Sequence, residues 1–302
     1  MVQPTPRWPV KTREIHNHHF DSTIWNDFPF RADDIVISTY AKSGTTWTQQ
    51  IVGQLLFAGE ADLAVAEVSP WLDLRVPPAA VKLAALEAQT HRRFIKTHLP
   101  VDALVFSPKA KYLYVGRDGR DVLFSMYNHH VQANEHWYSM LNDTPGLVGP
   151  KMDKPDPDVR RYFRHWVEND GAPHWSLWDS VSSWWAVRDL PNVKLVHFND
   201  LKADLAGEMG RIADFLEIDI PEADWPGIVH RCTFDYMKAN ADRFAPVGGI
   251  IFDGGGASFI NKGVNGRWRD VLSAEEVAAY ERTAVEKLGP GCARWLATGE
   301  LA

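Results

Sequence analysis

Residues 38–47 combine one lysine, one glycine and several hydroxyl side chains in the segment STYAKSGTTW. An apolar run precedes this segment at residues 35–37, and apolar side chains with helical spacing follow at Trp47, Ile51 and Leu55. The order predicts a strand, a tight loop and a helix. Free backbone N–H groups and the dipole at the start of a helix favour an anion. We therefore expect an anion-binding loop with these members: Lys42, Ser43, Gly44, Thr45, Thr46 and Trp47.

The loop resembles the phosphate-binding loop of NTPases only in part. The pattern G-x-x-x-x-G-K-[ST] needs a glycine at its first position and a lysine after Gly44, and neither is present. The lysine instead precedes Ser43, which favours a clamp for a 5′ anion that is not built around Mg²⁺ and a γ-phosphate. A nucleotide kinase or NTPase stays open as an alternative, and it would need an acidic Mg²⁺ ligand after a strand.

Two further segments place reactive side chains where a strand ends. FIKTHLP at residues 94–100 ends a strand with Lys96 and His98, and histidine is the side chain best suited to remove a proton from a hydroxyl at neutral pH. KYLYVGRDGRDV at residues 111–122 brings Arg117 to the end of another strand, and the following helix carries Ser125. An arginine fork and a hydroxyl together can hold a phosphate.

These segments, with RCTFDYMK at residues 231–238 and FINKGVNGRW at 259–268, resemble the ordered motifs of the cytosolic sulfotransferase family. The resemblance extends from about Arg31 to Arg269. It implies a single α/β domain over residues 1–302, with a central, mostly parallel sheet flanked by helices and a P-loop-like phosphosulfate loop. It also implies 3′-phosphoadenosine 5′-phosphosulfate (PAPS) as the sulfuryl donor and the desulfonated nucleotide PAP as the product.

The same resemblance implies roles for individual residues. His98 would be the general base, Lys42 and Lys96 would neutralise charge on the transferred group, and Ser125 would restrain Lys42 until the acceptor arrives. Trp47 and Phe234 would stack on the two faces of the adenine. The remaining contacts to the nucleotide would come from the following residues: Arg117, Ser125, Thr233, Met237, Asn261, Lys262 and Gly263.

The chain departs from the family pattern at several positions. Ala41 and Gly119 stand where proline is usual, and neither change removes a hydrogen-bond donor. Asn261 stands where arginine is usual, so we expect weaker binding of the nucleotide by about 1–2 kcal/mol. Phe198 stands where tyrosine is usual and would lose a hydrogen bond to the base.

The acceptor is harder to predict from the sequence. Aromatic walls favour a small hydrophobic phenol, alcohol or sterol-like hydroxyl compound. A glycolipid or carbohydrate acceptor stays open, because such sulfotransferases share the nucleotide motifs. Each side chain taken singly fits packing as well as contact, and the candidates are Phe20, Trp71, Tyr127, His130, Trp137 and Tyr138.

Strand-like and helix-like segments alternate around these motifs. Strands are expected at residues 35–38, 94–96, 112–115 and 193–198, and helices at 47–57, 121–130 and 204–216. This alternation predicts a largely parallel sheet whose ligands lie beyond the carboxyl ends of the strands. Two segments, 134–171 and 246–266, read as long irregular loops, which in compact domains are usually lids or binding segments.

Composition excludes several classes of protein. A net charge of −7 with no long basic run argues against nucleic acid as a partner. The N-terminus has no apolar signal region, and no stretch is long enough to cross a bilayer. Two cysteines, Cys232 and Cys292, make no disulfide framework, so we expect a reducing, cytoplasmic location.

Metal binding, loss of catalysis and the oligomeric state are separate questions that the sequence raises. Histidines 16, 18 and 19, or 129 and 130, have no cysteine or carboxylate at ligand spacing, so no metal site is predicted. An inactive nucleotide-binding protein stays open because of Asn261 and Phe198. The family's C-terminal dimer motif is not matched after Arg269, so the sequence does not predict the oligomeric state.

Overall fold

The computed structural model describes residues 7–301 and contains one four-stranded parallel sheet. Its strand order is β2-β1-β3-β4, and all three pairings are parallel. The strands are β1 (Ile35–Thr39), β2 (Phe94–Thr97), β3 (Lys111–Gly116) and β4 (Val193–His197). All four were predicted within two residues. β4 ends at His197 because the His197 side chain accepts a hydrogen bond from the Asn199 amide and so caps the next helix at Phe198.

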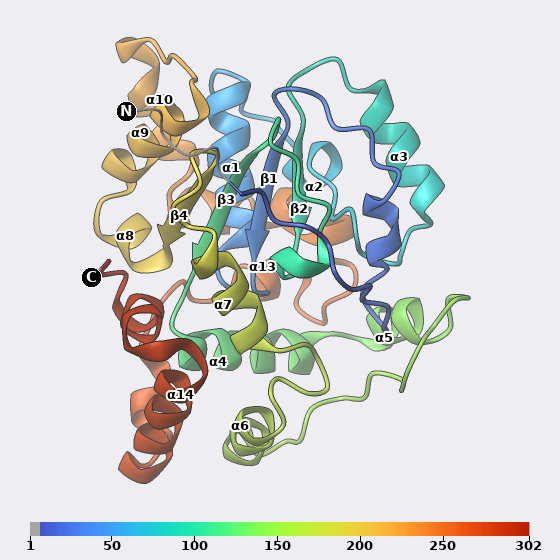
Figure 1. Ribbon diagram of the computed structural model, residues 1–302, viewed down its shortest axis with the longest axis vertical. Coiled ribbons are helices and arrows are strands. Elements are labelled where there is room, and N and C mark those ends of the chain that lie inside the picture. The colour runs from blue at the N-terminus through green and yellow to red at the C-terminus, as the bar shows by residue number, and fades with distance from the viewer. Residues whose placement is uncertain (1–6, 302) are drawn as a thin grey trace.

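Helices cover both faces of the sheet, as Figure 1 shows. Alternate residues of a strand point to opposite faces, and this separates two cores. Tyr112 and Tyr114 of β3 pack in the core that includes α7 and α14, whereas Leu113 and Val115 pack in the core that includes α1 and α9. The helices with five or more residues are α1 (Thr45–Leu56), α3 (Ala79–Ala88), α4 (Gly119–Gln132), α5 (Glu135–Asn142), α6 (Val159–Glu168), α7 (Leu177–Ala186), α8 (Phe198–Ala203), α9 (Leu205–Leu216), α10 (Trp225–Arg231), α11 (Phe234–Ala239), α13 (Gly255–Phe259) and α14 (Ala274–Thr298).

Short helical elements complete the chain. They are α2 (Val65–Val68), α12 (Ala241–Phe244), and the 3-10 turns η1 (Ser22–Trp25), η2 (Val101–Ala103), η3 (Glu222–Asp224), η4 (Pro246–Gly249) and η5 (Arg267–Asp270). None of the helices in residues 7–301 combines the length and the apolar character that a membrane span requires. Cys232 and Cys292 are both buried and both free.

The two segments expected to be irregular contain regular structure, so that expectation was wrong in part. Residues 134–171 include α5 and α6, which begin where the side chains of Asn134 and Asp158 accept hydrogen bonds from the first amides of each helix. Residues 246–266 include η4 and α13. The abundance of proline, aspartate and glycine suggested loops, but Asn and Asp serve here as helix caps.

Candidate active site

The loop between β1 and α1 has the backbone geometry of an anion site. Lys42 and Gly44 adopt positive φ angles of 68° and 107°, which turn the chain sharply into the helix. Among the described residues, no protein acceptor lies within hydrogen-bond range of the amides of Gly44, Thr45, Thr46 and Trp47. These N–H groups belong to the N-cap and first turn of a twelve-residue helix that has no side-chain cap. The Ser43 side chain is buried and does not reach the cavity wall, unlike its neighbours in the loop.

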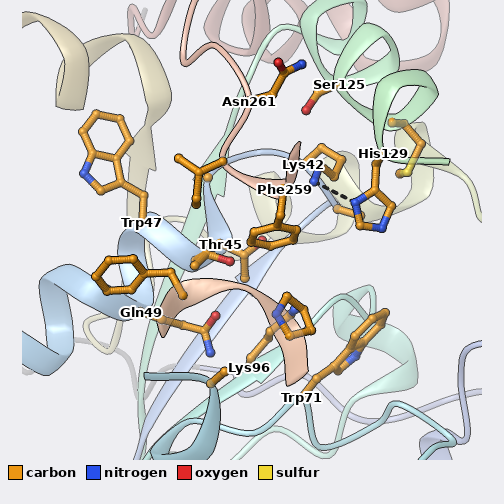
Figure 2. Close-up of a pocket in the computed structure, with 18 of the residues that line it drawn as sticks. Lys42, Thr45, Trp47, Gln49, Trp71, Lys96, Ser125, His129, Phe259 and Asn261 are labelled. Carbon is orange, nitrogen blue, oxygen red and sulfur yellow. Dashed lines mark hydrogen bonds between the residues drawn. The ribbon is translucent and has the colours of Figure 1, made fainter. Parts of the chain in front are cut away.

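The Lys42 ammonium group has an unexpected partner. Figure 2 shows it directed at His129, and Nζ lies 3.2 Å from Nδ1 of that ring. The ammonium also lies 4.7 Å from the centre of the Phe259 ring. Ser125 lines the same cavity, but the structure shows no hydrogen bond between it and Lys42. The structure thus pairs Lys42 with His129 and not with Ser125, and the restraint of Lys42 by Ser125 stays a prediction.

Lys96 projects from the carboxyl end of β2 toward the same cavity. Its ammonium lies 4.7 Å above the ring of Trp71. Burial lowers the pKa of Lys96 to about 8, and burial together with the charges of Lys96 and Arg117 lowers the pKa of Lys42 to about 7. In the described part of the chain, none of these three cations has a carboxylate within 4.0 Å. Buried Arg117 and half-buried Lys42 and Lys96, none of them in a salt bridge, make a site for an anion.

His98 follows β2 directly and is almost completely buried. Its Nδ1 donates to the carbonyl oxygen of Thr39 over 2.7 Å, which leaves Nε2 unprotonated in the neutral ring. The ring stacks on Trp175 at 5.9 Å and meets Trp71 edge-on at 4.5 Å. Burial, reinforced by Lys96, holds the pKa of His98 well below its usual value. The imidazole is thus neutral near pH 7 and able to accept a proton at Nε2.

Arg117 lies at the end of β3 and ties three segments together. It donates to the Lys42 carbonyl oxygen at 3.0 Å and to Asn265 Oδ1 at 2.8 Å. Its guanidinium stacks 4.1 Å from the centre of the Phe198 ring. Burial lowers the pKa of Arg117 to about 10. The structure thus places the arginine beside the loop as the sequence predicts.

Two aromatic rings proposed for the nucleotide base line the cavity from different elements. Trp47, on α1, donates from Nε1 to the Cys232 carbonyl oxygen over 2.7 Å and meets Phe198 edge-on. Phe234 is 37% exposed and packs against Gly263, where an added Cβ would lie 2.5 Å from the ring. Thr233 accepts from the Tyr236 amide and so starts α11.

The segment after α13 closes the other side of the cavity. Asn261, Lys262 and Gly263 all line it, and Lys202 donates to the Gly263 carbonyl oxygen over 2.9 Å. Arg267 also lines the cavity and has no salt bridge among the described residues. Arg267 lies in the segment FINKGVNGRW, yet nothing in the sequence around Arg267 distinguishes it from a surface arginine.

The candidate acceptor residues divide into two groups. Trp71, His130 and Trp137 line the cavity, as does Met237 of the proposed base-contacting segment. Phe20, Tyr127 and Tyr138 do not line it, so the structure does not support the expectation for these three residues. Phe20 is fully buried, the Tyr127 hydroxyl donates to Pro157, and the Tyr138 hydroxyl donates to His130. An aromatic residue gives no sign in the sequence of which way its ring will point.

The site residues described above, apart from Ser43, Phe20, Tyr127 and Tyr138, line one cavity of about 720 Å³. The loop before α1, Arg117 and Phe234 lie on its polar part, and Trp71 and Trp137 lie on its aromatic part. Several wall residues carry no signal that would have found them in the sequence: Trp175, His129, Phe252, Phe259 and Arg267. Across residues 7–301, no group of three or more His, Cys, Asp or Glu side chains is arranged to hold a metal ion.

Comparison with known proteins agrees with this geometry. A family model described as "Sulfotransferase domain" matches residues 32–290. The chain is 34% identical over 295 residues to a "Glycolipid sulfotransferase" of Mycobacterium tuberculosis, covering 89% of each chain. It is 30% identical over 277 residues to "Sulfotransferase 1A1" of Rattus norvegicus, covering 87% of each.

Solved structures show the same fold. Mouse sulfotransferase SULT7A1 complexed with PAP superimposes with a TM-score of 0.67 at 23% identity, covering 90% of each chain. Retinol dehydratase in a complex with retinol and PAP gives a TM-score of 0.68 at 24% identity, covering 88% of this chain and 84% of that one. With the match over most of its length, and with the ordered motifs gathered around one cavity, the chain belongs to the sulfotransferase family.

Proposed function

We propose that this sulfotransferase uses PAPS as donor and moves a sulfuryl group to the hydroxyl of a small hydrophobic acceptor. The observation that carries the proposal is the meeting of unpaired cations, free amides and an unprotonated imidazole nitrogen in one cavity. The two relatives crystallised with PAP have the same fold, which supports the nucleotide. Location in the cytoplasm also stays a proposal, supported by the two free cysteines.

The residues present fit a doubly phosphorylated nucleotide. The amides of residues 44–47 and Lys42 would hold its 5′ group. Arg117, Ser125, Lys262 and the Gly263 amide would hold its 3′-phosphate, with Asn261 beside them. Trp47 and Phe234 would hold the base between their rings, next to Thr233 and Met237. When bound, PAPS supplies an activated sulfuryl group.

The chain's own groups would act on the acceptor and on developing charge. His98 Nε2 would take the proton of the acceptor hydroxyl, while the Thr39 carbonyl oxygen keeps the ring oriented through Nδ1. Lys42 and Lys96 would neutralise the negative charge that grows on oxygen atoms during transfer. The hydrogen bond from Lys42 to His129 would have to break for this, so we propose His129, in place of Ser125, as the residue that holds Lys42 beforehand.

A glycolipid acceptor is a second candidate. One relative is named a glycolipid sulfotransferase, and the rim of the cavity here is apolar. Val247 lines the cavity and is 57% exposed, and the neighbouring Ile250 is 66% exposed. An acceptor with a hydrocarbon tail could leave the cavity across these two side chains.

Calorimetric titration with PAP, and separately with ADP and with ATP plus Mg²⁺, tests the proposed donor. We expect micromolar binding of PAP without metal and much weaker binding of ADP, because only PAP carries the 3′-phosphate. Preferential binding of ATP with Mg²⁺ would instead favour a nucleotide kinase or NTPase. Binding of none of the three would indicate a protein that keeps only the fold.

A further inference from the structure

A cluster of histidines lies at the aromatic part of the cavity. Its rings follow one another at centroid distances of 4.4 Å between His130 and His174, 6.4 Å between His174 and His18, and 4.6 Å between His18 and His19. His19 stacks on Trp71, the same ring that meets His98. Two members of the cluster, His19 and His130, line the cavity together with the proposed base.

The hydrogen bonds of His18 determine which nitrogen of His19 carries hydrogen. His18 Nε2 lies 2.7 Å from the carbonyl oxygen of Pro173, which can only accept, so Nε2 of His18 is the protonated nitrogen. His18 Nδ1 is then an acceptor, and its partner is His19 Nδ1. His19 must therefore donate from Nδ1, and its Nε2 has a free lone pair.

His130 is fixed in the same tautomer by the backbone. Its Nδ1 lies 2.9 Å from the Met126 carbonyl oxygen, so it donates there and leaves Nε2 unprotonated. Within residues 7–301, neither Nε2 of His19 nor Nε2 of His130 has a hydrogen-bond partner, although both rings are buried and line the cavity. Burial lowers the pKa of both rings, which keeps them neutral and preserves the lone pairs.

The cavity thus presents lone pairs from His19, His98 and His130. The three rings are not arranged as a metal-binding group, as no such group is found in the described chain. A ligand that fills the cavity and leaves these acceptors without a donor is disfavoured, so the site discriminates in favour of ligands that bring donors. An acceptor whose only polar group is the reacting hydroxyl would donate to His98 and would leave the nitrogens of His19 and His130 without a donor.

We propose that His19 and His130 form a recognition site for further hydroxyls of the acceptor, each nitrogen accepting from one hydroxyl, so that the acceptor is a diol or polyol. The inference rests on the proposed function, because it concerns the acceptor part of the same cavity. Aromatic diols and the hydroxyls of a sugar ring offer the same donor chemistry. Trp71 and Trp137 would pack against the faces of either kind of ring.

Pairs of acceptors that differ by one hydroxyl test the proposal. Transfer from PAPS is measured for 2,7-naphthalenediol against 2-naphthol, and for 4,4′-biphenol against 4-phenylphenol. A third pair, trans-1,4-cyclohexanediol against cyclohexanol, represents the sugar ring. The symmetric diols have two equivalent reacting groups, so their kcat/KM values are halved. We expect at least one diol to keep an advantage of about tenfold or more.

Variants assign that advantage to the two histidines. For each diol, the leucine variant that removes the accepting nitrogen, His19→Leu or His130→Leu, should bring the ratio of diol to mono-ol toward one, whereas Gln at the same position, which keeps an acceptor, should restore part of it. His165→Gln, at an exposed histidine outside the cavity, is the matched control and should keep the wild-type ratio. Each variant is first shown to bind PAP, which separates a failure of this proposal from a failure of the proposed donor.

Two results would overturn the proposal. One is a ratio of diol to mono-ol near one, after the statistical correction, for every pair in the wild-type protein. The ratio compares kcat/KM values, or binding affinities measured by calorimetry with and without PAP if none of the compounds reacts. The other is a diol preference that survives in both leucine variants. Long-range ¹H–¹⁵N correlation spectra give an independent test, because His19 and His130 should show the Nδ1–H tautomer, and Nε2–H signals would contradict the argument.

Discussion

Binding of PAP should draw protons from the solvent through Lys42 and Lys96. Both lysines are half-buried, neither has a carboxylate within 4.0 Å among the described residues, and their pKa values fall to about 7 and about 8. A bound anion stabilises the charged form of a lysine and so raises its pKa. Lysines that are partly neutral in the free protein must then take up protons when the phosphates bind.

The size of this uptake follows from the two pKa values. At pH 7.5 a lysine with a pKa of about 7 is about one quarter protonated, and one with a pKa of about 8 is about three quarters protonated. Full protonation in the complex therefore requires about 0.75 proton at Lys42 and about 0.25 at Lys96, about one in total. The phosphates of PAP contribute little, because their second pKa lies near 6 and they are already almost fully ionised.

Calorimetry in buffers with different ionisation enthalpies measures this number directly. The observed binding enthalpy should vary linearly with the buffer enthalpy, with a slope of about one proton for the wild-type protein at pH 7.5. Lys42→Gln should reduce the slope to about one quarter, and PAP affinity of the wild type should decline as the pH rises from 7 to 9. A slope near zero in the wild type would refute the reasoning, because the lysines would then be charged already or would not contact the phosphates.

Three further substitutions test separate parts of the structure. Gly263→Ala places a Cβ 2.5 Å from the Phe234 ring and should weaken PAP binding at least fivefold, as one stacked base contributes about 1–3 kcal/mol; unchanged affinity in the titration would exclude that ring as a contact. Asn261→Arg should tighten PAP binding about tenfold, about 1.4 kcal/mol, and equal affinity would mean that an arginine here makes no charge-assisted contact. Asp34→Asn breaks the fully buried ion pair with Arg93 and should reduce the free energy of unfolding, measured by urea denaturation, by about 3–5 kcal/mol. A loss below about 1 kcal/mol would contradict this expectation.

Much of the fold was predictable because its signals are local. Short runs of three to six residues, rich in β-branched and aromatic side chains, marked all four strands. The helices at residues 121–130 and 204–216 were recognisable from their periodicity, although α4 begins two residues earlier, at Gly119, where Asp118 caps it. The segment 134–171 was misjudged, since composition does not distinguish an aspartate in a loop from one that caps a helix.

The site was predictable where a motif fixes both the type of residue and its place at the carboxyl end of a strand. Lys42, His98 and Arg117 lie at the ends of β1, β2 and β3, and a parallel sheet brings those ends together. Trp175 and His129 were not predictable, because their roles depend on contacts with segments far away in the chain. Trp175 reaches His98 from the loop before α7, and His129 reaches Lys42 from α4.

The acceptor residues show the same limit for single side chains. Phe20 and Trp71 are both aromatic and their rings lie 5.8 Å apart, yet only Trp71 lines the cavity. Packing determines which of two adjacent rings faces the cavity, and a loop has no periodicity in its sequence from which this could be predicted. The tautomers of His19 and His130 depend likewise on carbonyl groups that only the folded chain brings near.

The central claim is that His98 removes the acceptor proton in a metal-independent transfer from PAPS. The most direct measurement is the release of PAP from PAPS with 2-naphthol or 2,7-naphthalenediol as acceptor, in the presence of EDTA, for the wild type and His98→Ala. We expect the wild type to release PAP only when acceptor is present. We expect His98→Ala to lower kcat at least about a hundredfold and to retain its affinity for PAP. Release that survives in His98→Ala, or that requires a divalent metal ion, would contradict the claim.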